Sequence, residues 1–390
     1  MLENALKICN GCHTCYSVCP KQAIKMFFNS EGFLYPQIDE GLCIKCGLCE
    51  KLCPVINPQK KDDEETLAYA VINNNEKIRL ESSSGGVFTA LAENVISQGG
   101  IVFGAKFNSD FNVIHGYTDS VEGLADFRGS KYVQSTIGDS YKDCKRFLEE
   151  GRNVLFSGTP CQIAGLKSFL NKEYENLLLV DIICHGVPSP LLWSEYKKYH
   201  EKKSASQIVK IAFRRKNDGW KQYSLAVTFG NASEYCQTLR QDAYLKLFLK
   251  DVCLRESCYN CKYKTEKRIS DITIADFWGV QNEYPELDDD KGTSFVITHS
   301  DKGKFSIEKM VDCTIKAIPI ENGVKYNPSY VRSVLKSRKR SSFFKELNML
   351  AEGNISLDKL VKKYTVDGFC VKGYRFIRRC LGKIKRMIVK

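Results

Sequence analysis

The chain has 390 residues, of which 43% are hydrophobic and 18 are cysteine, and its formal net charge is +12. The composition provides enough apolar surface for a large core, so it predicts a globular protein of two or three domains. No apolar run approaches the length of about 18 residues that a transmembrane helix needs, and the N-terminus lacks a signal-peptide pattern. We therefore expect a cytoplasmic protein, in which so many cysteines indicate metal ligation rather than disulfides.

The first predicted element is a duplicated cysteine motif. Residues 9–20 and 43–54 both fit C-x2-C-x2-C-x3-C-P, and each cysteine of the second copy lies 34 positions after its equivalent. Three closely spaced thiolates bind one 4Fe-4S cluster, while the fourth binds the other cluster. The ligands are therefore predicted to cross over, and they are Cys9, Cys12, Cys15 and Cys53 for cluster 1, and Cys19, Cys43, Cys46 and Cys49 for cluster 2. Two zinc sites are the alternative, but zinc takes only four ligands and does not explain the third cysteine or the Cys-Pro ending.

Between the two copies, turn residues at 29–32 separate two apolar runs, which predicts a hairpin. The hairpin would close a small bacterial-type ferredoxin module with two 4Fe-4S clusters over residues 1–60. A charged linker is expected at 61–66.

From residue 67 the pattern becomes that of an α/β domain. Apolar strand-like runs at 67–72, 101–107, 153–157 and 177–183 alternate with helical stripes at 87–98, 141–151 and 161–170. Beyond residue 205 the strands at 208–215 and 223–229 and a helix at 242–252 give the same domain α+β character. We assign residues 67–340 to one large flavin-binding domain, on the resemblance given below, and 341–390 to a helical extension.

Three turns of this domain are candidates for ligand binding. The small residues at 82–86 open a helix whose free N–H groups and dipole suit a phosphate, although an ordinary helix cap has the same appearance. The turns at 158–161 and 184–190 each follow an apolar strand, at the edge where open α/β sheets bind ligands. No G-x-G-x-x-G follows a strand, so direct nicotinamide binding is not indicated.

Four further cysteines could hold a third 4Fe-4S cluster. Cys161 and Cys184 follow neighbouring strands, and Cys258 and Cys261 form a C-x2-C pair, with Cys253 as a substitute ligand. A zinc site on the same residues or buried structural cysteines are the alternatives.

Six segments, taken in order, resemble the coenzyme F420-reducing hydrogenase/dehydrogenase beta-subunit family over nearly the whole chain. They are SSSGGVFTALA, RGSKYVQS, LFSGTPCQIAGL, DIICHGVPSP, LRESCYNCKY and DITIADFWG. The resemblance implies an FAD in the large domain, a 4Fe-4S cluster near it, and a pocket for a hydride donor or acceptor, which is coenzyme F420 in some members. The residues that it places at the flavin are Ser83, Ser84, Gly85, Gly86, Ser130, Lys131, Tyr132, Thr159 and Pro160.

Two points of this resemblance stay open. Lys131 could equally be a surface lysine. Ala275 stands where the family often has glycine, so Asp276 and Trp278 could simply form a strand end packed by aromatic rings.

Together these features predict an iron-sulfur flavoprotein oxidoreductase. It would pass electrons between a hydride-exchanging small molecule, FAD, the clusters and an external redox partner protein or complex, with His185 as a candidate proton-transfer residue. The alternatives are a non-catalytic electron-relay subunit of a larger redox complex, a redox sensor, or a reductase of an F420-unrelated substrate such as a surface-polysaccharide precursor.

The C-terminal residues 371–390 contain eight Lys or Arg and no acidic residue, with apolar residues at helical spacing. This pattern predicts a basic amphipathic helix that could bind the inner membrane face peripherally, dock an acidic redox partner, or cover the protein's own core. The basic runs at 213–216 and 336–340 are expected to be solvated faces and not nucleic-acid sites, because no aromatic stacking platform accompanies them.

Overall fold

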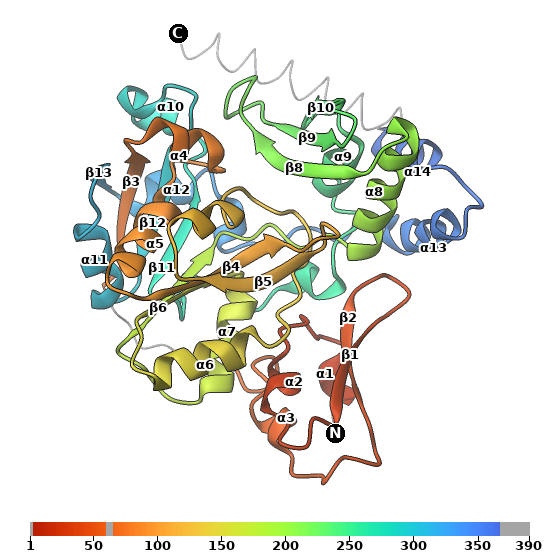
Figure 1. Ribbon diagram of the computed structural model, residues 1–390, viewed down its shortest axis with the longest axis horizontal. Helices are drawn as coiled ribbons and strands as arrows, with labels where there is room; N and C mark the ends of the chain where they lie inside the picture. Colours follow the sequence, from red (N-terminus) through yellow and green to blue (C-terminus); the bar gives the residue numbers. More distant parts are fainter. Residues whose placement is uncertain (1–2, 60–64, 367–390) are drawn as a thin grey trace, which may run out of the picture.

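The computed structural model describes residues 3–59 and 65–366. The N-terminal module is a small unit at the bottom of Figure 1, with the hairpin predicted from its turn residues. Strand β1 pairs antiparallel with β2 so that Ile24 faces Ile38 and Phe28 faces Leu34. Its elements are α1 (Glu3–Leu6), α2 (Thr14–Val18), β1 (Ile24–Phe28), β2 (Leu34–Ile38) and α3 (Leu48–Lys51).

The large domain is built on a mixed sheet, which in the described residues has eight strands in the order β13-β3-β12-β11-β7-β6-β4-β5. Its centre, from β11 to β4, is parallel, and the outer strands pair antiparallel. The strands are β3 (Leu67–Asn73), β4 (Ile101–Phe107), β5 (Val113–Thr118), β6 (Val154–Gly158), β7 (Leu177–Ile182), β11 (Ile272–Asp276), β12 (Ser294–Thr298) and β13 (Cys313–Ile318).

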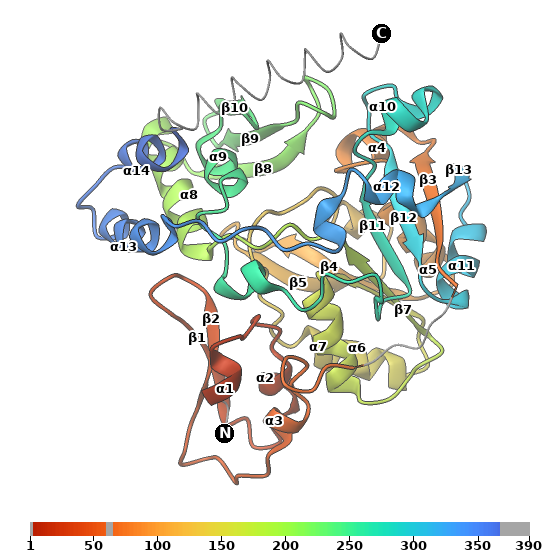
Figure 2. The ribbon, with the colours of Figure 1, turned by 180° about the vertical axis from the view of Figure 1, so that it is seen from behind.

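Helices cover both faces of this sheet because the buried strands are apolar on both sides. Helices α5 (Val87–Ser97) and α11 (Asp301–Glu308) pack on one face through Leu91 and Ile307. Helices α6 (Ser140–Glu149) and α7 (Pro160–Leu170) pack on the other face through Phe147 and Leu166, as Figure 2 shows from behind. The shorter helical segments of this domain are α4 (Glu76–Glu81), η1 (Glu122–Asp126), η2 (Glu256–Asn260), α10 (Val280–Glu283), η3 (Pro285–Leu287), α12 (Ile320–Val324) and η4 (Pro328–Tyr330).

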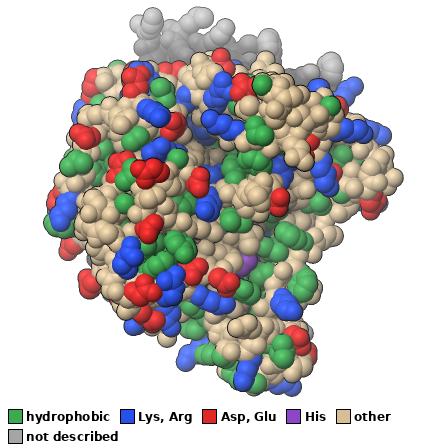
Figure 3. Space-filling view, in the orientation of Figure 1, with side chains coloured by type: hydrophobic (Ala, Val, Ile, Leu, Met, Phe, Trp, Pro, Cys, Tyr) green, Lys and Arg blue, Asp and Glu red, His purple; other side chains and the backbone are tan. Residues whose placement is uncertain are grey.

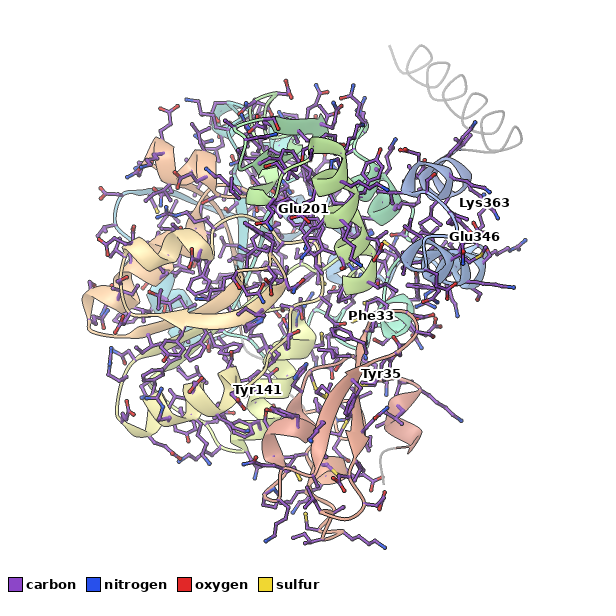
Figure 4. All side chains as sticks on the ribbon, turned by 45° about the vertical axis from the view of Figure 1, so that its right-hand side comes forward. Phe33, Tyr35, Tyr141, Glu201, Glu346 and Lys363 are labelled. Carbon is purple, nitrogen blue, oxygen red and sulfur yellow. The ribbon has the colours of Figure 1, made fainter. Side chains whose placement is uncertain are left out.

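A second antiparallel sheet, in the order β10-β9-β8, lies beside the large one (Figure 1). Four helices share its hydrophobic core, and Glu346 and Lys363 form an ion pair between two of them (Figure 4). These elements are α8 (Pro190–Ser204), β8 (Ile208–Arg215), β9 (Ser224–Phe229), β10 (Glu234–Thr238), α9 (Ala243–Leu249), α13 (Arg340–Ala351) and α14 (Leu357–Thr365). The arrangement confirms the predicted fold class of a small dicluster module followed by a mixed α/β domain.

The prediction that both basic runs are solvated faces is wrong for three of their residues. Arg214, Lys216 and Arg340 are buried, because each side chain has acceptors inside the protein. Lys216 Nζ donates to three backbone carbonyls at 2.7–2.8 Å, and the Arg340 guanidinium pairs with both Glu31 carboxylate oxygens at 2.6 Å.

The predicted basic helix at 371–390 and most of the linker lie outside the described residues. Within the described part of the chain, every helix is too short or too polar to cross a bilayer.

Candidate functional site

A cavity of about 970 Å³ opens between the large sheet and the second sheet. Its volume is at the upper end of the range of about 300–1,000 Å³ that small-molecule sites occupy. The loop before α5, the segment 128–135, and the turns after β6 and β7 all line it. The structure thus brings together the three predicted turns and the 130–132 segment, which lie far apart in the sequence.

The loop at 82–86 presents the start of α5 to the cavity. Gly86 takes the left-handed conformation (φ +87°) before the first helical residue, and no side chain caps the helix there. The Ser84 hydroxyl donates to Thr293 O at 2.7 Å, and a Cβ on Gly85 would lie 2.3 Å from Val71 O. Ser84 and Gly85 therefore fix the loop against the sheet, and the first turn of α5, whose N–H groups have no side-chain cap, lines the cavity.

Ser83 joins this loop to the segment around Lys131. Its hydroxyl shares a hydrogen bond of 2.7 Å with the Ser130 hydroxyl and accepts one from Ser130 N. Lys131 lines the cavity and is not a surface lysine, with Nζ donating to Arg128 O and Gly129 O. Burial lowers the pKa of Lys131 to about 7.

Arg214, expected from the sequence at a solvated face, holds the same loops from β8. Its guanidinium pairs with both Asp276 carboxylate oxygens at 2.9 and 3.0 Å and also donates to Ser83 O and Tyr132 OH. Its Nε is buried away from the cavity and has no hydrogen-bond partner, although other atoms of Arg214 line the cavity. Asp276 also accepts from the Trp220 indole N–H at 2.9 Å. Asp276 is therefore a charged anchor, while its neighbour Trp278 fits the aromatic-packing alternative by stacking on Trp220.

Basic side chains outnumber acidic ones in the cavity wall. Among the described residues, eight lysine and arginine side chains line the cavity against two acidic ones, Asp276 and Glu256. Both carboxylates pair with cations, Asp276 with Arg214 and Glu256 with Lys336 at 2.5 Å. Three other cations of the wall pair with carboxylates outside it, and these are Arg128 with Glu81, Lys221 with Asp288 and Arg268 with Asp181. Lys7, Lys262 and Lys264 leave the wall with an excess of positive charge. The cavity is therefore suited to anionic ligands.

The cysteines predicted to hold a third cluster meet at one end of this cavity. Cys161 lies in the first turn of α7, Cys184 follows β7, Cys258 lies within η2 and Cys261 directly follows it. Burial raises the pKa of the Cys161 thiol, and the other three thiols raise it further, so the four lie close together. Cys253 is instead fully buried in the core of the second sheet.

The eight cysteines of the duplicated motif form two groups with the crossed membership that the spacing predicts. Burial raises the pKa of Cys15, and Cys12, Cys9 and Cys53 add to the effect. The pKa of Cys49 is raised by burial and by the remaining three, Cys46, Cys19 and Cys43.

In each group, three cysteines of one copy lie with the fourth cysteine of the other copy. This is the ligand arrangement of a ferredoxin that holds two 4Fe-4S clusters.

Cluster 1 and the third cysteine group are neighbours across the module interface. Burial raises the pKa of the Tyr263 hydroxyl, and Cys12, Cys161 and Cys53 all contribute, so this hydroxyl lies near both groups. Asn10 Nδ2 donates to Tyr263 OH at 3.2 Å. The sequence offered no signal for Tyr263, because its neighbours come from distant segments.

His185 lines the cavity, and its Nε2 lies 2.6 Å from Asp251 Oδ1. Its ring edge packs on Phe248, so two contacts orient the imidazole. Thr159 caps α7 in a capping box with Gln162, and Pro160 is the first helical residue, so these two predicted flavin contacts position the turn that carries Cys161.

A second histidine in the wall, His115, was not singled out from the sequence. Ser135 Oγ lies 2.9 Å from its Nδ1, and Ser157 O lies 3.1 Å from its Nε2. The carbonyl requires a proton on Nε2, so the Ser135 hydroxyl donates to Nδ1. Burial lowers the pKa of His115 to about 4, and the ring is therefore a neutral, fixed part of the wall.

Comparison with known proteins finds a match for each of the two parts of the chain. Residues 151–322 match the family model for the C terminus of the coenzyme F420 hydrogenase/dehydrogenase beta subunit, and residues 8–57 match the 4Fe-4S dicluster domain. The coenzyme F420-dependent sulfite reductase of Methanocaldococcus jannaschii is 29% identical over 193 residues, which are 48% of this chain and 29% of that protein. An uncharacterized ferredoxin of the same organism is 34% identical over 64 residues, 15% of this chain and 82% of that protein.

Among solved structures, a chain of the F420-reducing NiFe hydrogenase complex of Methanosarcina barkeri aligns with a TM-score of 0.44 and 16% identity, over 78% of this chain and 94% of that one. The chain spans less than a third of the length of the sulfite reductase. The match at 8–57 confirms the predicted dicluster module, and the match at 151–322 confirms the resemblance seen in the sequence motifs.

Proposed function

We propose that this chain, which belongs to the F420 hydrogenase/dehydrogenase beta-subunit family and carries an N-terminal 4Fe-4S dicluster domain, is an FAD-dependent iron-sulfur oxidoreductase. A flavin exchanges a hydride with an organic molecule and passes electrons singly, which is the chemistry that would connect a small-molecule cavity to iron-sulfur clusters.

One observation carries this proposal. Cys161, Cys184, Cys258 and Cys261 lie close together in the cavity wall, and the Tyr263 hydroxyl lies near both Cys161 and Cys12. A third 4Fe-4S cluster on these cysteines would border the cavity and lie near cluster 1. A non-catalytic relay subunit would not need a cavity of about 970 Å³ at this point.

The wall of the cavity fits FAD in its polar parts. The uncapped start of α5 behind Gly86 offers backbone N–H groups to a pyrophosphate, and Lys131 and the excess of basic side chains favour the same anion. Ser83 and Ser130 would contact the flavin or hold the loop that does.

His185 is proposed to hold or move the proton that accompanies hydride exchange, at the ring nitrogen that does not face Asp251. Asp251 is then a positioning residue, because it contacts the imidazole and orients it.

Coenzyme F420 is the hydride partner that we propose first. The sulfite reductase relative is named for its dependence on this coenzyme. The positive cavity wall supports an anionic partner of this kind.

The decisive experiment is anaerobic purification followed by iron and flavin analysis. Three clusters correspond to about 12 iron atoms per chain and two clusters to about 8. We expect about 12 iron atoms with one flavin, and about 8 iron atoms in Cys258→Ala. Cys253→Ala is the matched control, since Cys253 is buried in a core away from the cavity, and it should keep about 12.

A wild-type content of about 8 iron atoms, unchanged by Cys258→Ala, would contradict the third cluster. Absence of flavin from protein that holds its iron would contradict the FAD proposal. Adding reduced coenzyme F420 to the flavin-loaded protein should bleach the flavin absorbance, and no bleaching would exclude F420 as the partner while leaving the cofactor assignment intact.

A further inference from the structure

The internal duplication allows two copies of the same cluster-binding loop to be compared in one molecule. Residues at equivalent positions are 34 apart, and the pairs are Asn10 with Ile44, Gly11 with Lys45, Cys12 with Cys46, and His13 with Gly47. Both copies have the same backbone form. The second and fourth positions of each loop are left-handed, with φ of +72° and +66° in copy 1 and +55° and +75° in copy 2.

The copy 1 loop is docked onto the large domain. Asn10 is 8% exposed and Cys12 is 7% exposed. Arg255 Nε donates to Cys9 O and Gln134 Nε2 donates to Asn10 O, both at 2.9 Å. These contacts use backbone carbonyls, so the loop serves as a docking surface inside the protein.

The close approach of these side chains requires glycine in copy 1. A Cβ on Gly11 would lie 2.8 Å from Gln134 Nε2 and 2.9 Å from Arg255 Nη1. In copy 2 the equivalent residue is Lys45, which is exposed and holds the left-handed conformation at a steric cost that glycine would avoid.

The copy 2 loop also exposes apolar side chains beside its cluster. Ile44 is 58% exposed, Leu42 is 51% exposed, and the ligand Cys46 is exposed. Lys21, which borders the same cysteines, is exposed as well. Figure 3 shows hydrophobic and basic side chains together over the lower lobe, which is the ferredoxin module.

Two acidic residues, Asp39 and Glu40, begin this segment and are exposed. Asp39 Oδ1 accepts the Gly41 N–H at 3.0 Å and so closes the turn before the loop. The tip itself, from Leu42 to Cys46, carries Lys45 as its one charged side chain.

We propose that the segment 42–46, with Lys21 beside it, is the docking surface for an acidic electron-carrier protein. The inference rests on the proposed function, in which cluster 2 faces an external redox partner. Copy 1 shows that a loop of this conformation can pack against a protein surface. In copy 2, Lys45 stands where copy 1 has Gly11, so its side chain would prevent a surface like that of Gln134 and Arg255 from packing on the loop. Carboxylates that surround an apolar patch complement Ile44, Leu42 and the two lysines.

The test measures binding rather than turnover. Anaerobically purified full-length protein, with its iron content verified, is titrated with an acidic two-iron ferredoxin in its oxidised form, at about 20 mM and about 500 mM salt. Lys45→Glu should weaken binding at least tenfold at low salt and much less at high salt. Ile44→Ser should weaken it severalfold at both, and Lys45→Gly should weaken it less than Lys45→Glu while keeping the loop conformation.

The chain offers a matched control pair on β8, where Val209 is 56% exposed and the following Lys210 is exposed. Lys210→Glu and Val209→Ser should change the affinity less than twofold. Equal losses in Lys45→Glu and Lys210→Glu, or tighter binding of a basic c-type cytochrome than of the ferredoxin, would overturn the proposal. So would the absence of ferredoxin binding at low salt. None of these outcomes depends on the flavin, so a failure here is distinct from a failure of the proposed function.

Discussion

Arg214 joins segments of the chain that the sequence keeps far apart. It extends from β8 to Asp276 at the end of β11, and from there to Ser83 O and Tyr132 OH. Its ion pair is buried, with 2% of the arginine side chain and 17% of the aspartate side chain exposed. Breaking such a pair leaves an uncompensated charge inside the protein.

Arg214→Met should therefore lower the free energy of unfolding by about 3 kcal/mol, because Asp276 loses its cation. The flavin content of the purified variant should fall with it, since Ser83 and Tyr132 lose their shared donor. Urea denaturation and flavin extraction measure the two effects. The control is Arg215→Met, which breaks a half-exposed pair with Glu234 and should cost less than about 1 kcal/mol. Similar losses in both variants would contradict the anchoring role.

His200 gives a residue-scale prediction with a definite pH dependence. Its ring lies 4.4 Å from the Tyr196 ring and 4.1 Å from the Tyr235 ring, and its buried Nε2 has no hydrogen-bond partner. Burial, together with the nearby Lys203 charge, lowers the pKa of His200 to about 4. The unfolded chain therefore binds a proton near pH 6.5 that the folded chain does not, and stability falls as the pH drops from 6.5 to 4.

His200→Phe removes this loss. The quantity to compare is the free energy of unfolding of His200→Phe minus that of the wild type. This difference should be about 2 kcal/mol larger at pH 5 than at pH 7.5, as anaerobic urea unfolding at the two pH values would measure. The comparison between the two pH values cancels any packing change that the larger ring introduces. A stability difference that is the same at both values would contradict the burial of a neutral imidazole.

At the scale of elements, most strands and helices could be predicted from the sequence, since apolar periodicity is local. The hairpin at β1 and β2, the strand β3 and the helix α5 all lie where their patterns predict them. The prediction that the basic run at 213–216 is a solvated face was wrong, because the burial of its residues depends on distant parts of the chain. The acceptors of Arg214 and Lys216 come from other elements, and no local pattern reveals such a partner.

The cysteine groups show the same contrast. The spacing C-x2-C-x2-C-x3-C-P is enough to predict the two N-terminal cysteine groups. Spacing does not tell whether Cys184 or Cys253 joins the third group, because that depends on how α8 and the second sheet pack. Tyr263 and His115 carry no motif at all, so they emerge only when distant segments are brought together.

Helix α7 provides the element-scale prediction, because it carries Cys161 at one end and touches the ferredoxin module in its middle. A Cβ on Gly165 would lie 2.7 Å from Tyr141 OH and 2.9 Å from Cys12 Cβ. Gly165 O also accepts from Thr14 Oγ1 at 3.0 Å. The absence of a side chain therefore sets how closely α7 approaches cluster 1.

Gly165→Ala should overpack this contact and cost about 1–3 kcal/mol. Because the clash falls on Cys12, the cluster absorbance should bleach at a lower urea concentration than in the wild type. Gly230→Ala is the control, since a Cβ there meets its neighbours only at ordinary contact distances of 3.4 Å and more. Bleaching at an unchanged urea concentration in Gly165→Ala would contradict the close approach.

At the scale of the whole molecule, one buried arginine ties the ferredoxin module to the large domain. Arg255 donates to Cys9 O, to Leu34 O and to Gln134 Oε1, all at 2.9–3.0 Å, and is fully buried. Its guanidinium lies 4.2 Å from the centre of the Tyr35 ring, and Figure 4 shows Phe33 and Tyr35 on the hairpin where it meets the large domain. The module is thus held by both of its halves, at a cluster loop and at a strand.

Arg255→Lys should loosen the module without unfolding the large domain. A lysine presents a point charge and cannot satisfy three acceptors in a planar arrangement, so at least one buried carbonyl loses its donor, at a cost of about 1–3 kcal/mol. Backbone amides of β1 and β2 should then exchange hydrogen for deuterium about tenfold faster or more, while those of β6 and β7 keep their rates.

Arg240→Lys, a change at an arginine outside the module interface, is the matched control and should leave both sets of amides unaffected. The pattern of exchange decides between two physical pictures. Faster exchange in β1 and β2 alone means that the module undocks as a unit while the large domain persists. Equally faster exchange in β6 and β7 would mean that module and domain unfold together, and that the interface around Arg255 is part of one cooperative core.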